Sequence, residues 1–182
     1  MSKYFIILLL ILGQENTFCQ TRNDSIIYWS CKRNLKWEDF QGKPHSDVVG
    51  EAAICCSGLS YHYHEEEDTI VSFVIKAEFL KYKSWTRTDS SWDLNHEQGH
   101  FDITEIFARK LRKSYLNIDP SLRSNSEEMH NKFLYYMKEL KKFQNEYDAY
   151  TLHGLSRETQ IEWSLKIKQM LTELKEFEID DE

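Results

Sequence analysis

The stretch LNHEQGHFDI, residues 94–103, determines how the rest of the chain is organised. It contains the pattern His-Glu-x-x-His, by which a helix offers two imidazoles to a zinc ion and a carboxylate to the water bound there. At about 100° per residue, His96 and His100 lie about 40° apart on one face, and Glu97 lies on its flank. The pattern therefore predicts His96 and His100 as metal ligands and Glu97 as the catalytic carboxylate.

The residues around this pattern predict a helix from about 90 to 114. Ser90 can cap its start, with Asp93 three residues later as the capping-box partner. An amphipathic stripe follows at spacings of four, three and four. Gly99 costs about 1 kcal/mol against alanine in a helix, and its missing side chain is expected to leave room for substrate or a neighbouring backbone. The stripe consists of His96, His100, Ile103 and Phe107.

Before this helix the chain is typical of strands between residues 26 and 82. A short apolar strand is expected over 26–31. Residues 51–64 and 69–82 alternate with a period of two on either side of four acids, which predicts an antiparallel hairpin. A sheet edge beside the motif helix is expected to bind extended peptide by strand addition.

After the motif helix the chain predicts two further helices, over about 124–153 and 156–178. Ser124 and Glu127 form a second capping-box pattern, and Gly154 suits the end of the middle helix. Apolar residues recur along both helices at spacings of four and three, which is typical of core packing. The predicted fold class is α+β, an N-terminal antiparallel sheet followed by three helices.

A zinc site that keeps one position open needs a third protein ligand. His153 is favoured, because zinc prefers imidazole. Asp148 is the alternative, either as a ligand or as the hydrogen-bond partner of a ligand's free ring nitrogen. Glu105 points about 160° away from the two histidines and is expected to be a surface acid.

Two tyrosines near these candidates have the chemistry to stabilise an oxyanion. They are Tyr147 and Tyr150, but their positions in the apolar stripe favour core packing. His62 and His64 alternate along a strand, where they could form a second metal pair. They lead into an acidic turn, so solvated or cross-strand roles are favoured.

The cysteines do not have the paired spacing of a cysteine-rich zinc site. Cys31, Cys55 and Cys56 are expected to be structural, either buried or with Cys31 bridged to one of the adjacent pair.

The first nineteen residues predict a secretory signal peptide. Lys3 supplies positive charge, and the nine-residue apolar run from Tyr4 to Leu12 is too short to span a bilayer. The protein is therefore expected to be exported to the periplasm or the extracellular space. Acylation at Cys19 is an alternative that Phe18 disfavours. Residues 20–182 are predicted to form one domain.

The formal net charge of −7 argues against nucleic acid or an anionic membrane as partner, because no basic patch is present. No second apolar stretch reaches membrane length. The acids near the C-terminus, Glu178 among them, are expected to be solvated.

Four blocks of the sequence resemble, in order, the bacterial family called domain of unknown function 922. They are residues 35–42, 57–61, 96–103 and 147–154, and Trp163 also resembles a family position. The family is regarded as predicted secreted zinc-dependent proteases. The resemblance implies a zincin-like site with His96 and His100 as ligands, Glu97 as catalytic carboxylate and His153 as the third ligand.

The expected function is that of a zinc metallopeptidase with one zinc ion per chain. Glu97 would act as general base toward a zinc-activated water that hydrolyses a peptide bond in a peptide or protein substrate. Two alternatives stay open at this stage. One is a non-catalytic envelope binding module with a structural zinc, and the other is a zinc amidase that acts on cell-wall peptides.

Overall fold

A long antiparallel hairpin carries the helical half of the molecule. In the computed structural model, which describes residues 3–6, 25–44, 50–67 and 69–179, it consists of β4 (Ser57–Glu66) and β5 (Thr69–Leu80). Tyr61 lies opposite Ile75 in its register. The alternation of residues 51–64 and 69–82 thus predicted this pairing correctly, because every second side chain faces the core. The inward face of the hairpin includes Leu59, Ile75, Ala77 and Phe79.

Two short strands extend this sheet and two more form a separate pair. The four-stranded sheet has the order β1-β4-β5-β2, with β1 at Lys3–Ile6 and β2 at Ile26–Tyr28. The second sheet pairs β3 (Ala53–Ile54) with β6 (Trp85–Thr86), and β6 lies beyond the range predicted for strands.

The break between β3 and β4 falls at the adjacent cysteines. There the Cys56 amide donates to Ser84 Oγ at 2.9 Å, outside the ladder. The predicted strand 51–64 is therefore two strands, and its first part leaves the main sheet.

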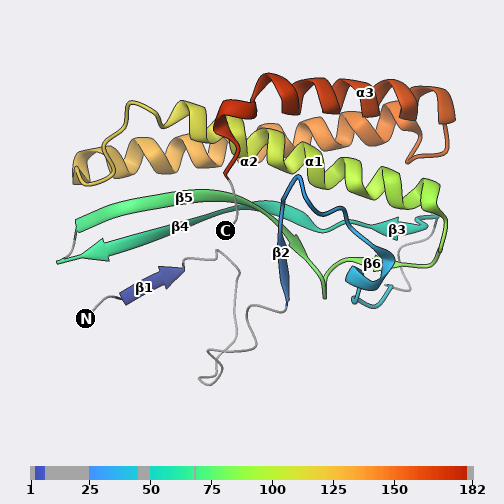
Figure 1. Ribbon diagram of the computed structural model, residues 1–182, viewed down its shortest axis with the longest axis horizontal. Coiled ribbons are helices and arrows are strands. Elements are labelled where there is room, and N and C mark those ends of the chain that lie inside the picture. The colour runs from blue at the N-terminus through green and yellow to red at the C-terminus, as the bar shows by residue number, and fades with distance from the viewer. Residues whose placement is uncertain (1–2, 7–24, 45–49, 68, 180–182) are drawn as a thin grey trace.

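Three helices cover one face of the hairpin, as Figure 1 shows. They are α1 (Ser91–Ser114), α2 (Ser126–Thr151) and α3 (Arg157–Glu173), which confirms the predicted order of a sheet followed by three helices in an α+β fold. Single 3-10 turns occur at Trp37–Asp39, Arg123–Asn125 and Lys175–Phe177.

The middle of α1 is buried on more than one side, because it packs on β5 and also against α2 and α3. A simple amphipathic stripe was therefore an incomplete description of this helix. Its buried apolar residues are Phe101, Ile103, Ile106, Phe107, Ala108 and Leu111.

The two predicted helix caps have different outcomes. Ser90 caps α1, and its hydroxyl accepts from the Asp93 amide at 3.3 Å. The capping box predicted at Ser124 is wrong, because that residue lies in a 3-10 turn and α2 begins only at Ser126.

Glu105 is a buried member of a charge network and not a surface acid. Only 2% of it is exposed, and its Oε1 lies 2.9 Å from Arg109 Nε and 3.0 Å from Arg112 Nη1. Arg112 also donates to the Phe177 carbonyl at 2.6 Å. Arg109 Nη2 lies 3.0 Å from Glu178 Oε2, an ion pair without hydrogen-bond alignment, so the prediction of a solvated Glu178 was also wrong.

The network connects the C-terminal turn to α1 through Glu105, so we expect the loss of this acid to destabilise the fold. Glu105→Ala is expected to lower the free energy of unfolding by about 3–5 kcal/mol, because two guanidinium groups lose their common partner. Glu128→Ala is the matched control on α2. Its exposed pair with Lys132, at 3.4 Å, should contribute less than about 1 kcal/mol. Urea unfolding of both variants makes the comparison, and equal small losses would contradict the role of the network.

The cysteine prediction is also corrected. No disulfide joins Cys31 to Cys55 or Cys56, and Cys31 is exposed. Burial raises the pKa of the Cys55 thiol well above its ordinary range, which disfavours the thiolate.

Most of the predicted signal peptide, including Cys19, lies outside the described residues. Of that segment, Lys3–Ile6 forms β1 beside β4, a strand pairing that we did not expect. Signal cleavage and export stay predictions. Within the described ranges, no helix is long and apolar enough to cross a membrane.

Candidate metal centre

A cavity of about 240 Å³ opens where β3, the first turns of α1 and the end of α2 meet. The separation of β3 from the main sheet brings the backbone of residues 52–55 to one wall. The other walls carry most of the candidate site residues. The polar and charged lining side chains are Glu51, Asp93, His96, Glu97, His100, Gln144, Asp148 and His153.

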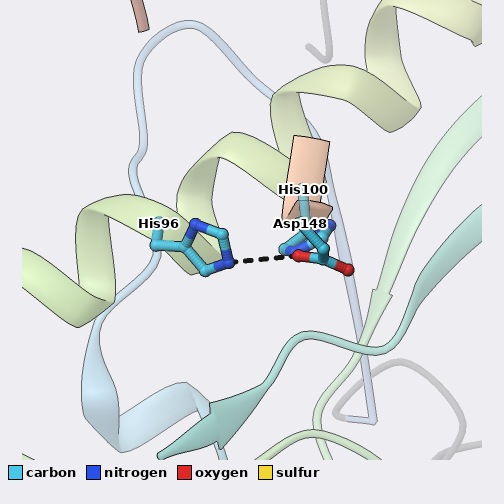
Figure 2. Close-up of side chains that lie close together, drawn as sticks. All are labelled: His96, His100 and Asp148. Atoms are coloured by element: carbon cyan, nitrogen blue, oxygen red, sulfur yellow. Dashed lines mark ion pairs between the residues drawn. The ribbon is translucent and has the colours of Figure 1, made fainter. Parts of the chain in front are cut away.

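Three side chains converge in this cavity, as Figure 2 shows. Asp148 Oδ1 lies 2.9 Å from His100 Nε2 and 3.3 Å from His96 Nε2. The three ligating atoms all lie within 4.8 Å of one another, and among the described residues they form the one such group of three or more. Two imidazoles and a carboxylate make a donor set that zinc accepts.

The geometry gathers Asp148, the alternative ligand, and leaves His153 at the rim. His153 Nδ1 lies 4.0 Å from Asp148 Oδ1 and 3.6 Å from Glu51 Oε1, and its side chain is 57% exposed. The reason is the end of α2. Leu152 and His153 both adopt left-handed conformations, with φ of 51° and 54°, so α2 ends here and the backbone of Gly154, not the His153 side chain, packs against His96.

His96 is held from three sides. Its ring stacks on Tyr147, with 4.7 Å between ring centroids, and its Nδ1 lies 2.9 Å from Gln160 Oε1. Gly154, with φ of 80°, lies behind the ring, where a Cβ would come within 3.0 Å of His96 Cγ. Gln160 was not predicted, although a glutamine one turn before Trp163 on the buried stripe of α3 was a visible signal.

Glu97 is buried beside the two histidines, with 6% of it exposed. Burial raises its pKa, and the neighbouring His100 and His96 together with a hydrogen bond from the Cys55 amide offset part of this rise. The Cys55 amide also fixes the carboxylate against the wall formed by residues 52–55. A carboxylate with a raised pKa is suited to taking and returning a proton near neutral pH.

The two tyrosines considered for an oxyanion lie elsewhere. Tyr147 is fully buried, and its hydroxyl donates to the His96 carbonyl at 3.1 Å and accepts from Gln160 Nε2 at 2.6 Å. Tyr150 is 65% exposed, and neither tyrosine lines the cavity. Core packing, the reading that the apolar stripe favoured, agrees with the placement of Tyr147 but not with that of Tyr150.

His62 and His64 each pair with an acid. His62 Nε2 lies 3.2 Å from Glu78 Oε1, and His64 Nε2 lies 3.2 Å from Glu66 Oε1. This agrees with the cross-strand and solvated roles that the sequence favoured.

Gly99 makes room for Tyr147, and not for substrate or backbone as expected. A Cβ at position 99 would lie 2.8 Å from Tyr147 Cζ and closer still to its hydroxyl. Any side chain here would force the phenol off the His96 ring.

Gly99→Ala is therefore expected to lower the free energy of unfolding by about 1–3 kcal/mol, although alanine is the better helix former. Gly58→Ala is the control, because nothing lies within 4 Å of a Cβ built there. Thermal unfolding of both variants tests this. A Gly99→Ala protein as stable as the Gly58→Ala protein would show that Tyr147 is not confined.

The protonation states of His96 and Asp148 are coupled. Burial alone would lower the pKa of His96, but hydrogen bonds with Asp148 and Gln160 raise it above its ordinary value. Burial alone would raise the pKa of Asp148, but hydrogen bonds from His100 and His96 hold it far below its usual range. Without a cation, a proton on His96 balances the carboxylate of Asp148.

This coupling predicts the pH dependence of the cation-free protein. The contribution of His96 is complete below its ordinary pKa of about 6.5 and is lost as pH rises through the raised value in the folded state. The contribution of Asp148 is lost only in strong acid, as pH falls through its depressed pKa. Chelator-treated wild type should therefore lose stability as pH rises above about 6.5, and Asp148→Asn should lose less. Urea unfolding at several pH values measures this. The same change in the free energy of unfolding with pH in both proteins would contradict the coupling.

Comparison with known proteins identifies the region that holds this site. The family model described as bacterial protein of unknown function (DUF922) matches residues 82–154. The match confirms the resemblance to that family and spans the motif helix, Asp148 and His153. The resembling blocks at 35–42 and 57–61, and Trp163, lie outside it. No curated protein and no solved structure matches the chain.

Proposed function

We propose that the protein is a zinc-dependent metallopeptidase whose metal is held by His96, His100 and Asp148. The observation that carries this proposal is the convergence of the two Nε2 atoms on Asp148 Oδ1, at 3.3 and 2.9 Å, beside a buried Glu97. The donor atoms fit zinc in type and in number, because a catalytic zinc takes three protein ligands and keeps one position open. Zinc bound there would supply a Lewis acid that polarises a carbonyl and makes water more acidic.

The chain's own residues account for the proton transfers. Glu97 would take a proton from the attacking water and return it to the leaving nitrogen, the two transfers that peptide hydrolysis requires. Its raised pKa favours the protonated form that returns the proton to the leaving nitrogen. The Cys55 amide orients this carboxylate, while Asp148, with its depressed pKa, stays ionised as a ligand.

A peptide substrate is supported by the second edge of β3, with which no strand pairs among the described residues. Ala52 accepts from the Arg87 amide at 2.7 Å on the side of β6. Backbone groups alternate between the two edges of a strand, so the N–H and C=O of Ala53 lie on the same edge as the Cys55 amide, which faces Glu97. An extended peptide that adds to this edge would pass beside the catalytic carboxylate.

Glu97→Gln tests the proposal. The substitution keeps the size of the side chain but removes its ability to accept a proton, so we expect zinc binding to persist and peptide cleavage to fall by at least about 100-fold. Zinc content by elemental analysis and cleavage of an unstructured protein such as casein provide the two readouts. Glu38→Gln, on an exposed residue of the Trp37–Asp39 turn, is the control and should change neither.

Three other outcomes would contradict the proposal in distinguishable ways. Glu97→Gln that cleaves as fast as wild type would exclude Glu97 as the base. Stoichiometric zinc in wild type without cleavage of any peptide would indicate a binding module with a structural zinc. Cleavage of purified peptidoglycan but not of unstructured protein would indicate a zinc amidase of the cell envelope.

A further inference from the structure

Gln160 is a buried amide on α3, at the interface with the other two helices. It is 1% exposed and extends from α3 to the space between His96 and Tyr147. Its Oε1 lies 2.9 Å from His96 Nδ1, and its Nε2 lies 2.6 Å from the Tyr147 hydroxyl. A buried amide is stable only when its donors and its acceptor are paired. Each of these hydrogen bonds therefore has a defined donor and a defined acceptor.

The hydrogen bonds form a closed circuit that begins and ends at His96. The His96 carbonyl can only accept, so the Tyr147 hydroxyl, 3.1 Å away, donates to it. The same hydroxyl oxygen then accepts from Gln160 Nε2, which turns the Gln160 carbonyl toward the imidazole. A carbonyl oxygen 2.9 Å from Nδ1 requires that Nδ1 carry the proton.

This arrangement determines which ring nitrogen can bind a cation. A protonated His96 donates from both ring nitrogens, from Nδ1 to Gln160 at 2.9 Å and from Nε2 toward Asp148 Oδ1 at 3.3 Å. The shorter contact with Gln160 keeps the proton on Nδ1 when the ring is neutral, so Nε2 then presents the lone pair. The Tyr147 ring and the Gly154 backbone prevent the imidazole from turning over. A histidine without such a partner would divide between two tautomers, of which one cannot use Nε2 as a ligand.

We propose that Gln160 is a positioning residue, which fixes the tautomer and orientation of His96 so that Nε2 is held ready for a divalent cation. The cation in this statement rests on the proposed function, whereas the tautomer does not. The same circuit explains why α3, which supplies no metal ligand, contacts the site through a glutamine. Partners of this kind on a metal-binding histidine change metal affinity by about 10- to 100-fold when they are removed.

The experiment compares wild type with three variants. Gln160→Met has similar length and no acceptor, Gln160→Glu keeps an acceptor for Nδ1, and Gln169→Met is the control on the exposed face of α3, where the amide donates to Glu173. Nitrogen-15 NMR of labelled histidines in the cation-free protein, at a pH where the ring is neutral, reports which nitrogen of His96 is protonated. Chelator competition gives the zinc dissociation constant.

We expect the proton on Nδ1 in wild type, in Gln160→Glu and in Gln169→Met, and a mixture of tautomers in Gln160→Met. The zinc dissociation constant of Gln160→Met should rise by about 10- to 100-fold, while that of Gln160→Glu should stay within several-fold of wild type.

Two results would overturn the proposal. One is a wild-type His96 with its proton on Nε2, a measurement that does not depend on any variant folding. The other is a folded Gln160→Met protein that binds zinc as tightly as wild type. If wild type carries the proton on Nδ1 but takes up no zinc, the proposed function fails and the tautomer assignment stands.

Discussion

Asp148 and the two motif histidines meet across the interface between α1 and α2, and the site depends on this contact. A single carboxylate oxygen lies within 3.3 Å of both imidazoles, although Asp148 is far from them in sequence. Four carboxylates, those of Glu51, Asp93, Glu97 and Asp148, line a cavity that has no lysine or arginine among its lining residues. Their charge has to be balanced there, either by protons on the imidazoles or by a cation that displaces those protons.

Each of the three helices contributes a different part of this arrangement. The first supplies the imidazoles and Glu97, the second supplies the carboxylate and the phenol that stacks on His96, and the third supplies Gln160. Gly99 and Gly154 allow the close approach of their neighbours to the motif helix. At the other end of the same helix, two acids, Glu105 and Glu178, and two arginines form a charge network that is already balanced within the chain. The charges at one end of α1 therefore neutralise one another. The charges at the other end need protons or a cation to be balanced.

The sequence predicted what depends on local periodicity. The alternation of residues 51–64 and 69–82, the His-Glu-x-x-His spacing and the apolar stripes predicted the hairpin and three helices in order. Periodicity could not decide whether Asp148 or His153 is the third ligand, because the two lie close together at the end of the same helix. Only the left-handed residues at the end of α2 determine which one faces the histidines. Gln160 was missed because a pattern of apolar residues treats a buried amide as an interruption. Glu105 was assigned to the surface because its helix was expected to have one buried face, whereas packing on both the sheet and the helices buries several.

The identity of the third ligand tests this account most directly. Zinc content after equilibration with one equivalent of zinc and removal of the unbound metal compares wild type with Asp148→Asn and His153→Ala. We expect one zinc ion per chain in wild type and in His153→Ala, and a substantial loss in Asp148→Asn. Retention of a full equivalent by Asp148→Asn, together with its loss from His153→Ala, would contradict it, and so would a wild-type protein that binds no zinc.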